Sequence, residues 1–427
     1  MRKVLKDKKT LAKCHIYQML RSAAKERHIS FHTPGHKIGK WDITELAFSD
    51  NLSSPRGCIA RAQADIAQIL GAKSAFIVTD GSTIGVLSML FTAKALGVQR
   101  LAVGENSHKS VWNGCAVAGI SPVVVTGQNA KGIPLPITME SLQDVEADAV
   151  FITSPDYYGN VPDLAAIRAY CDTHGKLLLI DGAHGGHLHF DKKLYAGAYA
   201  DMWVDGVHKS LPAFTQGAVV CARTEKTAAA LAKSVDVFRT TSPSYPIMAS
   251  VEYAVKYPRN EWLETQAQRW KSTQARIVGG EDWTKIGVLF GKNAFAAHER
   301  LQKEGVYAEF CDGNVLSFYL SPATEQKDFL RLQKRIKKLL EEYPYIPVED
   351  APTPLFSRKT GKKAWVDIEK SVGQVCAENC GLFPPCTPLL RVGEVITEEK
   401  IRLLQAADNV YGVRENQISV FNDTDEE

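Results

Sequence analysis

The sequence predicts an α/β fold with a large, mostly parallel sheet and a smaller α+β domain on the C-terminal side. Between residues 74 and 221, short continuous apolar runs alternate with helix-like segments, a pattern typical of parallel strands that helices cover on both faces. The alternation stops at a turn-rich stretch, residues 241–246. The chain has 427 residues, which favours more than one domain. The domains that we expect are an N-terminal segment over 1–50, a large domain over 51–260 and a small domain over 261–427.

The apolar runs give the positions of the expected strands. In the large sheet these are residues 75–78, 101–103, 123–125, 150–152, 177–180, 202–204 and 218–220. Segments 83–96 and 164–173 have the amphipathic spacing of helices that connect such strands. In the C-terminal part we expect a strand at 315–320 and helices at 327–342, at 366–379 and from 398 onward. Ligands of open α/β sheets bind beyond the carboxyl ends of the strands, so the residues that follow each run are the candidates for a site.

The composition is that of an ordinary globular protein. Hydrophobic residues make up 45% and charged residues 23%, with a net charge of +3. This charge gives no reason to expect nucleic acid as a partner, and no run approaches the ~18 apolar residues of a membrane helix. The nine cysteines fit reduced thiols in a cytoplasmic protein. Cys376, Cys380 and Cys386 match no familiar zinc spacing, so we expect them to be small buried side chains.

The first candidate motif is Asp80-Gly81-Ser82-Thr83, which follows an expected strand and opens an expected helix. Backbone N–H groups at a helix N-terminus, together with two hydroxyl groups, form a cradle for phosphate. The same residues are also common in turns and helix caps. Taken alone, the motif therefore supports a phosphate site only weakly.

Two further candidates follow later strands. Asp181 comes directly after the apolar run 177–180, and a carboxylate there can pair with the pyridinium nitrogen of a cofactor. Lys209 lies in His208-Lys209-Ser210, after the run 202–204, and a lysine amine of lowered pKa can form a Schiff base. Asp181 alone could be a turn residue and Lys209 alone a solvated lysine. A phosphate cradle, an aspartate and a lysine in this order on one sheet together indicate an enzyme that uses pyridoxal phosphate (PLP).

His184, His187 and His189 suggest an alternative, a transition-metal site. Two of the three could share one face of a strand. No carboxylate or cysteine set accompanies them apart from Asp181, which the PLP interpretation already uses. The sequence therefore favours a protein without a metal ion.

Several ordered blocks resemble the Orn/Lys/Arg decarboxylase family, group III of the amino-acid decarboxylases and part of the aspartate aminotransferase superfamily of fold type I PLP enzymes. The blocks are FHTPGHK at 31–37, DITEL at 42–46, LSSPRG at 52–57, DGST at 80–83, NSHKS at 106–110, TSPDYYG at 153–159, DGAHGGH at 181–187, HK at 208–209, TQG at 215–217 and TSPSYPIMAS at 241–250. The resemblance covers nearly the whole chain and implies a fold type I PLP-binding large domain.

The resemblance also implies roles. Lys209 would hold PLP as a Schiff base, Asp181 would keep its pyridine nitrogen protonated, and His108 would stack on the ring. His108 and His208 join Lys209 and Asp181 as implied catalytic residues. The implied cofactor-binding residues are Gly81, Ser82, Thr83, His108, Asp181, Ala183, His184, His208, Lys209, Thr241 and Ser242. The implied reaction converts lysine, ornithine or arginine to the amine. Thr241 and Ser242 match a segment that reaches a partner subunit's site. The resemblance therefore predicts that the active unit is at least a homodimer. Sedimentation at assay concentration tests this prediction, and a fully active monomer would contradict it.

Some residues depart from the family pattern. Gly206 stands where the family usually has serine, Asp156 where many members have threonine, and the C-terminal Tyr-Pro-Pro-Gly-Ile-Pro is replaced by FPPCTP at 383–388. These departures leave the substrate open. They also leave two alternatives: another PLP reaction, for which Arg391 is a candidate carboxylate clamp, or a non-catalytic protein that kept the fold. A cationic substrate needs a carboxylate or several carbonyl groups at the far end of its pocket. The sequence does not place that group, which a partner subunit could also supply.

Overall fold

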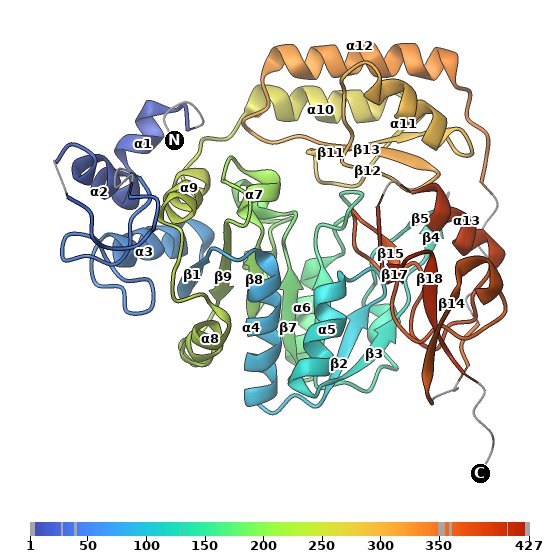
Figure 1. Ribbon diagram of the computed structural model, residues 1–427, viewed down its shortest axis with the longest axis horizontal. Helices are drawn as coiled ribbons and strands as arrows, with labels where there is room; N and C mark the ends of the chain where they lie inside the picture. Colours follow the sequence, from blue (N-terminus) through green and yellow to red (C-terminus); the bar gives the residue numbers. More distant parts are fainter. Residues whose placement is uncertain are drawn as a thin grey trace.

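A seven-stranded sheet forms the centre of the computed structural model (Figure 1), which describes residues 5–26, 29–37, 41–130, 132–348, 355–357, 361–407 and 409–422. Its strand order is β1-β9-β8-β7-β6-β2-β3. The strands are β1 (Ser74–Val78), β2 (Arg100–Gly104), β3 (Ser121–Val125), β6 (Ala149–Thr153), β7 (Leu177–Asp181), β8 (Met202–Asp205) and β9 (Ala218–Ala222). Each expected strand is confirmed. All run in one direction except β9, which is antiparallel to both β1 and β8.

Both faces of this sheet are buried under helices, which explains why its strands are continuous apolar runs. In β7, Leu178 and Ile180 belong to the core on one face and Leu179 to the core on the other. Burial of each such side chain contributes roughly 1.5–3 kcal/mol. The first face is covered by α3 (Cys58–Leu70), α6 (Leu164–Thr173) and α9 (Tyr245–Val255), and the second by α4 (Ser82–Ala95), α5 (Lys109–Ala118) and α8 (Glu225–Phe238).

The N-terminal helices α1 (Lys8–Ala12) and α2 (His15–Ala23) join the first of these cores rather than forming one of their own. The fully buried Glu252 of α9 accepts hydrogen bonds from the first two backbone N–H groups of α2, at 2.6 and 2.9 Å. It therefore caps α2 from a distance, in place of a local side chain.

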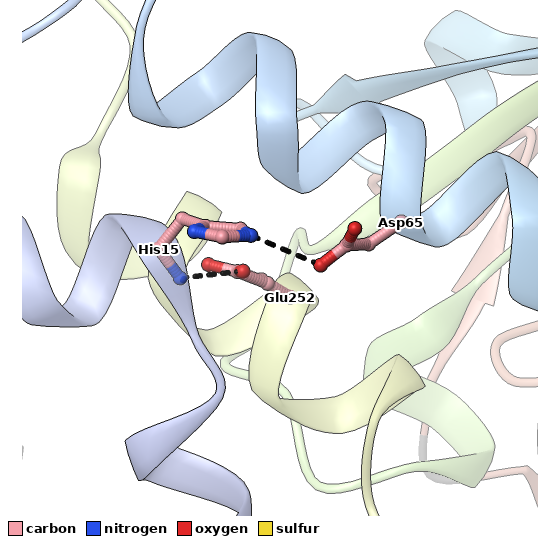
Figure 2. A group of neighbouring side chains, drawn as sticks. All are labelled: His15, Asp65 and Glu252. Carbon is pink, nitrogen blue, oxygen red and sulfur yellow. Dashed lines mark hydrogen bonds and ion pairs between the residues drawn. The ribbon is translucent and has the colours of Figure 1, made fainter.

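His15, Asp65 and Glu252 lie close enough together to resemble a metal site (Figure 2). The Lys256 ammonium, however, donates to Asp65 Oδ2 at 2.6 Å and to Glu252 Oε1 at 2.8 Å. The two carboxylates thus already share a cation, and His15 Nε2 adds a contact of 3.1 Å to Asp65. This group ties α2, α3 and α9 together as an ion-pair network.

A second, antiparallel sheet has the order β10-β11-β13-β12. Its strands are β10 (Ile277–Val278), β11 (Lys285–Leu289), β12 (Phe310–Cys311) and β13 (Val315–Tyr319). Figure 1 shows α10 (Glu261–Thr273), α11 (Ala294–Gln302) and α12 (Gln326–Glu342) together on one side of it, and their apolar residues share one core with its strands. The strand expected at 315–320 and the helix expected at 327–342 are confirmed.

The C-terminal part corrects one prediction. The helix expected at 366–379 is wrong, because Val366 lies in β14 (Lys363–Asp367), which pairs with β18 (Gln417–Phe421). A short 3₁₀ helix, η4 (Ile368–Ser371), follows, and Gly373 has a φ of 82°, which ends any helical run. The distant partner strand outweighs the local helical pattern, as is common for strands. The helix expected from residue 398 is confirmed as α13 (Glu398–Ala406).

The remaining short elements are β4 (Asn129–Ala130), β5 (Ile133–Pro134), β15 (Gly381–Leu382), β16 (Val410–Tyr411), β17 (Val413–Arg414), η1 (Glu140–Leu142), η2 (Gly186–Phe190), η3 (Ala196–Ala198) and α7 (Val207–Ser210). Among the described residues, no helix is both long enough and apolar enough to span a membrane. Cys376, Cys380 and Cys386 are buried, as expected. The domain boundaries at 50 and 260 stay a prediction.

Candidate active site

A cavity of about 420 Å³ lies at the carboxyl ends of the parallel strands. Asp181 ends β7, Lys209 lies on α7 just after β8, and Ser82 begins α4 just after β1. The predicted cofactor-binding residues that line it are Gly81, Ser82, Thr83, His108, Asp181, Ala183, His184, His208 and Lys209. Strands that run in one direction bring these residues to a common edge, although they are far apart in the sequence. Their roles toward a cofactor stay a prediction at this point.

Lys209 contacts a histidine inside the cavity. Its Nζ lies 3.1 Å from His184 Nε2. Burial lowers the pKa of Lys209, while the Asp181 carboxylate opposes this shift. Burial also holds the pKa of His184 well below its usual range, with Lys209 adding to the effect. A neutral imidazole beside a lysine of lowered pKa is a setting in which the amine can act as a nucleophile.

Asp181 is 3% exposed and faces the same cavity. Its Oδ1 accepts a hydrogen bond of 3.0 Å from the Ala183 N–H. Burial raises the pKa of Asp181, whereas the charge of Lys209 lowers it. A buried carboxylate is costly without a cationic or hydrogen-bonding partner, and the protonated nitrogen of a pyridine ring in the cavity fits this requirement.

The start of α4 offers an anion site. Gly81 is the N-cap residue, with a φ of 83° and no side-chain cap hydrogen bond. The first N–H groups of a helix have no partner within the helix, and the Ser82 and Thr83 hydroxyls line the same cavity. A phosphate group is a suitable acceptor for these donors. The residues present therefore fit PLP at both its ring nitrogen and its phosphate.

Two further histidines line the cavity with fixed rings. His108 is the N-cap of α5, where its Nδ1 accepts the Ser110 N–H at 3.1 Å, and burial lowers its pKa to about 3. His208 Nδ1 donates to the Gly217 carbonyl at 2.9 Å, and burial lowers its pKa also. Both rings are thus neutral near pH 7, and the Nε2 of His208 is left to interact with a ligand.

Other predicted residues lie elsewhere. Thr241 and Ser242 are exposed and do not line the cavity in the single chain, so their role at a partner's site stays a prediction. The idea that two of the three clustered histidines share a strand face is wrong, since they lie in the turn after β7 and in η2. His187 Nε2 contacts Asp282 Oδ1 at 2.8 Å, and His189 Nδ1 donates to a backbone carbonyl at 2.7 Å. The histidines have separate partners and do not converge.

Asp156, a departure from the family pattern, and Arg391, the candidate carboxylate clamp, both have structural partners. Asp156 Oδ1 accepts the N–H groups of Tyr158 and Asn160 at 2.8 and 2.9 Å, so it organises the loop after β6. Arg391 lies between Glu105 and Glu394, at 3.4 and 3.8 Å, and is not among the lining residues. Arg391 therefore lies outside the cavity of the single chain, and its role as a carboxylate clamp stays a prediction.

The cavity also contains residues that the sequence did not single out. Glu309, Phe310 and Tyr319 come from β12, β13 and the segment before them, and residues 383–386 close another side. No local motif marks Glu309, because only the packing of the second sheet brings it to Lys209. The cavity thus contains a carboxylate, one of the two kinds of group that can pair with a cationic side chain.

Comparisons with known proteins agree with this geometry. The sequence model of the Orn/Lys/Arg decarboxylase major domain matches residues 40–277. The chain belongs to the Orn/Lys/Arg decarboxylase family. It is accordingly an enzyme of the amino-acid decarboxylase class, whose members are PLP-dependent carboxy-lyases.

Three relatives illustrate the range of this family. The uncharacterized protein YaaO of Bacillus subtilis is 27% identical, over 95% of this chain and 98% of its own. The arginine decarboxylase of Bacillus subtilis is 25% identical, over 90% of this chain and 92% of its own. The constitutive lysine decarboxylase of Escherichia coli has a similar fold, with a TM-score of 0.71 and 19% identity, over 96% of this chain and 82% of its own. The fold is that of the fold type I enzymes.

The structure explains why the family's serine is absent at Gly206. A Cβ atom on Gly206 would lie 2.5 Å from the carbonyl oxygen of Ala183, a cavity residue. That contact is with backbone, so it cannot be relieved by rotating a side chain. Gly206 thus allows β8 and the loop after β7 to approach closely, and its presence does not indicate a disabled site.

Gly206→Ser is therefore expected to harm this chain rather than to improve it. Overpacking of this kind costs about 1–3 kcal/mol, and it displaces Ala183, so both Tm and PLP affinity should fall. Thermal unfolding and titration with PLP measure the two effects. Gly35→Ala is the matched control, because a Cβ there meets no atom within 4 Å. A Gly206→Ser protein with unchanged Tm and tighter PLP binding would show that a hydroxyl is missing here.

Cys386 replaces the glycine of the family's C-terminal motif. It has a φ of 66°, in the left-handed region that favours glycine, and its carbonyl accepts the Lys109 N–H at 3.0 Å. The hydrogen bond holds this turn against the start of α5, so the Cys386 side chain lines the cavity.

Proposed function

We propose that this enzyme binds PLP through Lys209 and decarboxylates a basic amino acid to the corresponding amine. The observation that carries this proposal is the position of Glu309 in the same cavity as Lys209 and Asp181. Lys209 and Asp181 support the cofactor, while Glu309 supports a substrate with a cationic side chain. The family membership of the chain agrees with both parts.

PLP, when bound, supplies an electron sink that accepts the electron pair left on Cα as carbon dioxide departs. Lys209 would hold the cofactor through its Nζ atom, which lies in the cavity. Asp181 would keep the ring nitrogen protonated, and the donors at the start of α4 would hold the phosphate. His108 and Ala183, which line the cavity, would pack against the cofactor. The proton that finally reaches Cα would come from Lys209 Nζ, because the neutral His208 ring holds its one proton at Nδ1, where it donates to the Gly217 carbonyl.

The side chain of the substrate extends toward Glu309. Phe310, Tyr319 and Phe383 line the cavity near this carboxylate and provide apolar surface for a methylene chain. The carboxylate of Glu309 then pairs with the ammonium or guanidinium group at its end, an interaction that a neutral side chain does not make. This arrangement selects lysine, ornithine or arginine over uncharged amino acids.

The proposal is tested by incubating the PLP-loaded enzyme with a panel of amino acids and measuring carbon dioxide and amine products. Lysine, ornithine or arginine should yield its amine, whereas alanine and leucine should not. Glu309→Gln should raise KM for the active substrate by about tenfold or more, since a hydrogen bond to a charged group contributes about 1.5–3 kcal/mol. The kcat should change less, because this contact is made before the reaction as well as during it.

Glu299→Gln is the matched control for Glu309→Gln. Glu299 lines the neighbouring cavity but not the one that contains Lys209. Its loss should leave KM within about twofold of wild type. Equal KM values for wild type and Glu309→Gln would remove Glu309 from substrate recognition, and a panel without any amine product would reject the decarboxylase function.

A further inference from the structure

A buried ion pair of the second sheet lies directly behind the candidate active site. Lys285, at the start of β11, is 1% exposed, and Asp282 is fully buried. Lys285 Nζ donates to Asp282 Oδ2 at 3.0 Å, to Thr284 Oγ1 at 2.9 Å and to the His184 carbonyl at 3.1 Å. It also lies 4.6 Å from the ring centroid of Tyr319. The three ammonium protons are thus all used.

The Asp282 carboxylate also accepts hydrogen bonds at both of its oxygens. Its Oδ1 accepts from His187 Nε2 at 2.8 Å, and from the N–H and hydroxyl groups of Thr284 at 2.8 and 2.7 Å. Burial alone would raise the pKa of Asp282, but His187 and Lys285 hold it well below its usual range. The carboxylate is therefore charged and is fixed from both of its oxygens.

Lys285 contacts two residues that line the cavity. It holds the backbone of His184, whose Nε2 lies 3.1 Å from Lys209 Nζ. It also holds the ring of Tyr319, whose hydroxyl donates to the Tyr157 carbonyl at 2.8 Å. The His184 ring stands edge-on between Tyr157 and Tyr319, at centroid distances of 4.9 and 5.4 Å. The ion pair is thus connected to Lys209 through a single intermediate residue, His184.

The stem of Lys285 is confined as well. A Cβ on Gly159, in the loop after β6, would lie 2.8 Å from Lys285 Cβ. The loops after β6 and β7 therefore both rest on this one side chain. A buried ion pair seldom contributes more stability than a well-packed apolar pair of similar volume. Stability alone thus gives no reason to keep these charges behind the cavity.

We propose that Lys285, held by Asp282, is a positioning residue of the decarboxylation site, which fixes His184 and Tyr319 so that the His184 imidazole stays against Lys209. This inference rests on the proposed function. Two changes follow when the pair is removed. The loop that carries His184 loses its anchor, and the positive charge of Lys285 is no longer near Lys209.

The experiment compares PLP-loaded wild type with Lys285→Met and with the double variant Lys285→Met, Asp282→Asn. The double variant removes both charges of the pair together, while Lys271 Nζ keeps its backbone acceptors, the Gly280 and Asp282 carbonyls, so it is the one expected to fold with a Tm near that of wild type. The matched control is Lys256→Met, Glu252→Gln, which removes a similarly buried pair that does not line the cavity. Tm, kcat, KM and the pH at which the visible absorbance of bound PLP changes are measured for each protein.

The absorbance readout reports on the proton held at Lys209. The charged or titratable groups that surround Lys209 are Asp181, His184, His108, His208, Glu309, Cys386 and Lys285. Lys285 is the residue among them that the variants change, and its positive charge lowers the pKa of Lys209. Its removal alone should therefore shift the absorbance change to higher pH, and the double variant should shift it less because the Asp282 charge is removed too.

We expect kcat to fall about tenfold or more in the double variant, with a smaller change in KM, as for a residue that acts on orientation. The control pair should keep kcat and the absorbance profile of wild type. A double variant with wild-type kcat and profile overturns the inference, and so does a control pair that loses as much activity. Wild-type protein that binds PLP but forms no amine rejects the proposed function instead, while the absorbance profiles still test the positioning.

Thr284→Val covers the case in which both Lys285 variants fail to fold. It removes one acceptor from Lys285 and leaves both charges in place. A measurable fall in kcat at unchanged Tm supports the inference, and wild-type kcat and absorbance profile contradict it.

Discussion

Lys209→Ala protein is expected to lack the visible absorbance of Schiff-base PLP and to form no amine. The physical reason is that Lys209 Nζ, 3.1 Å from His184 Nε2, is placed in the cavity beside Asp181 and has a pKa that burial lowers. Without it the cofactor keeps only its phosphate and ring contacts. Absorbance after PLP titration and an amine assay measure the two losses, and the fall in kcat should be among the largest of any single substitution.

Lys109→Ala provides the control, because Lys109 also lines the cavity but lies above the Phe383 and Tyr411 rings, at 5.9 and 5.0 Å. This variant should keep the absorbance of bound PLP. The assignment of Lys209 fails if Lys209→Ala retains the absorbance, or if wild-type protein stays colourless after incubation with PLP.

Asp181→Asn is expected to bind PLP and to lose catalysis. Asparagine keeps the size of Asp181 and can still accept the Ala183 N–H, so the fold and the phosphate contacts should persist. The amide carries no charge, however, and the ring nitrogen loses the partner that keeps it protonated. The electron sink is then weaker, and kcat should fall by about a hundredfold or more, as for other electrostatic contributions in buried sites. KM should change much less.

Asp205→Asn is a suitable control for Asp181→Asn. Asp205 ends the neighbouring strand β8, is 1% exposed and accepts the Tyr195 hydroxyl at 2.6 Å, but does not line the cavity. Its substitution should affect Tm more than kcat. Near-normal kcat in a folded Asp181→Asn protein would return Asp181 to the role of a turn residue.

The sequence by itself determined the large sheet and one half of the site. Continuous apolar runs mark strands buried on both faces, and the position of Asp181 at the end of such a run predicts its place at the sheet edge. The same reasoning predicts that Lys209 and Ser82 lie near Asp181, because strands in one direction share a carboxyl edge. These inferences depend on local pattern and chain order, which the sequence contains directly.

Only the tertiary structure decided which residues form the other half of the site. Glu309, Tyr319 and Lys285 come from a separate sheet, and no local pattern says which of its side chains will face Lys209. The same limit explains the error at 366–379, where β14 forms because β18 pairs with it from far along the chain. It also explains Gly206, where an added Cβ would lie 2.5 Å from the Ala183 carbonyl oxygen, a closeness of two distant segments that the sequence does not reveal. Contacts between distant segments depend on how the elements pack together, and packing is a property of the whole chain.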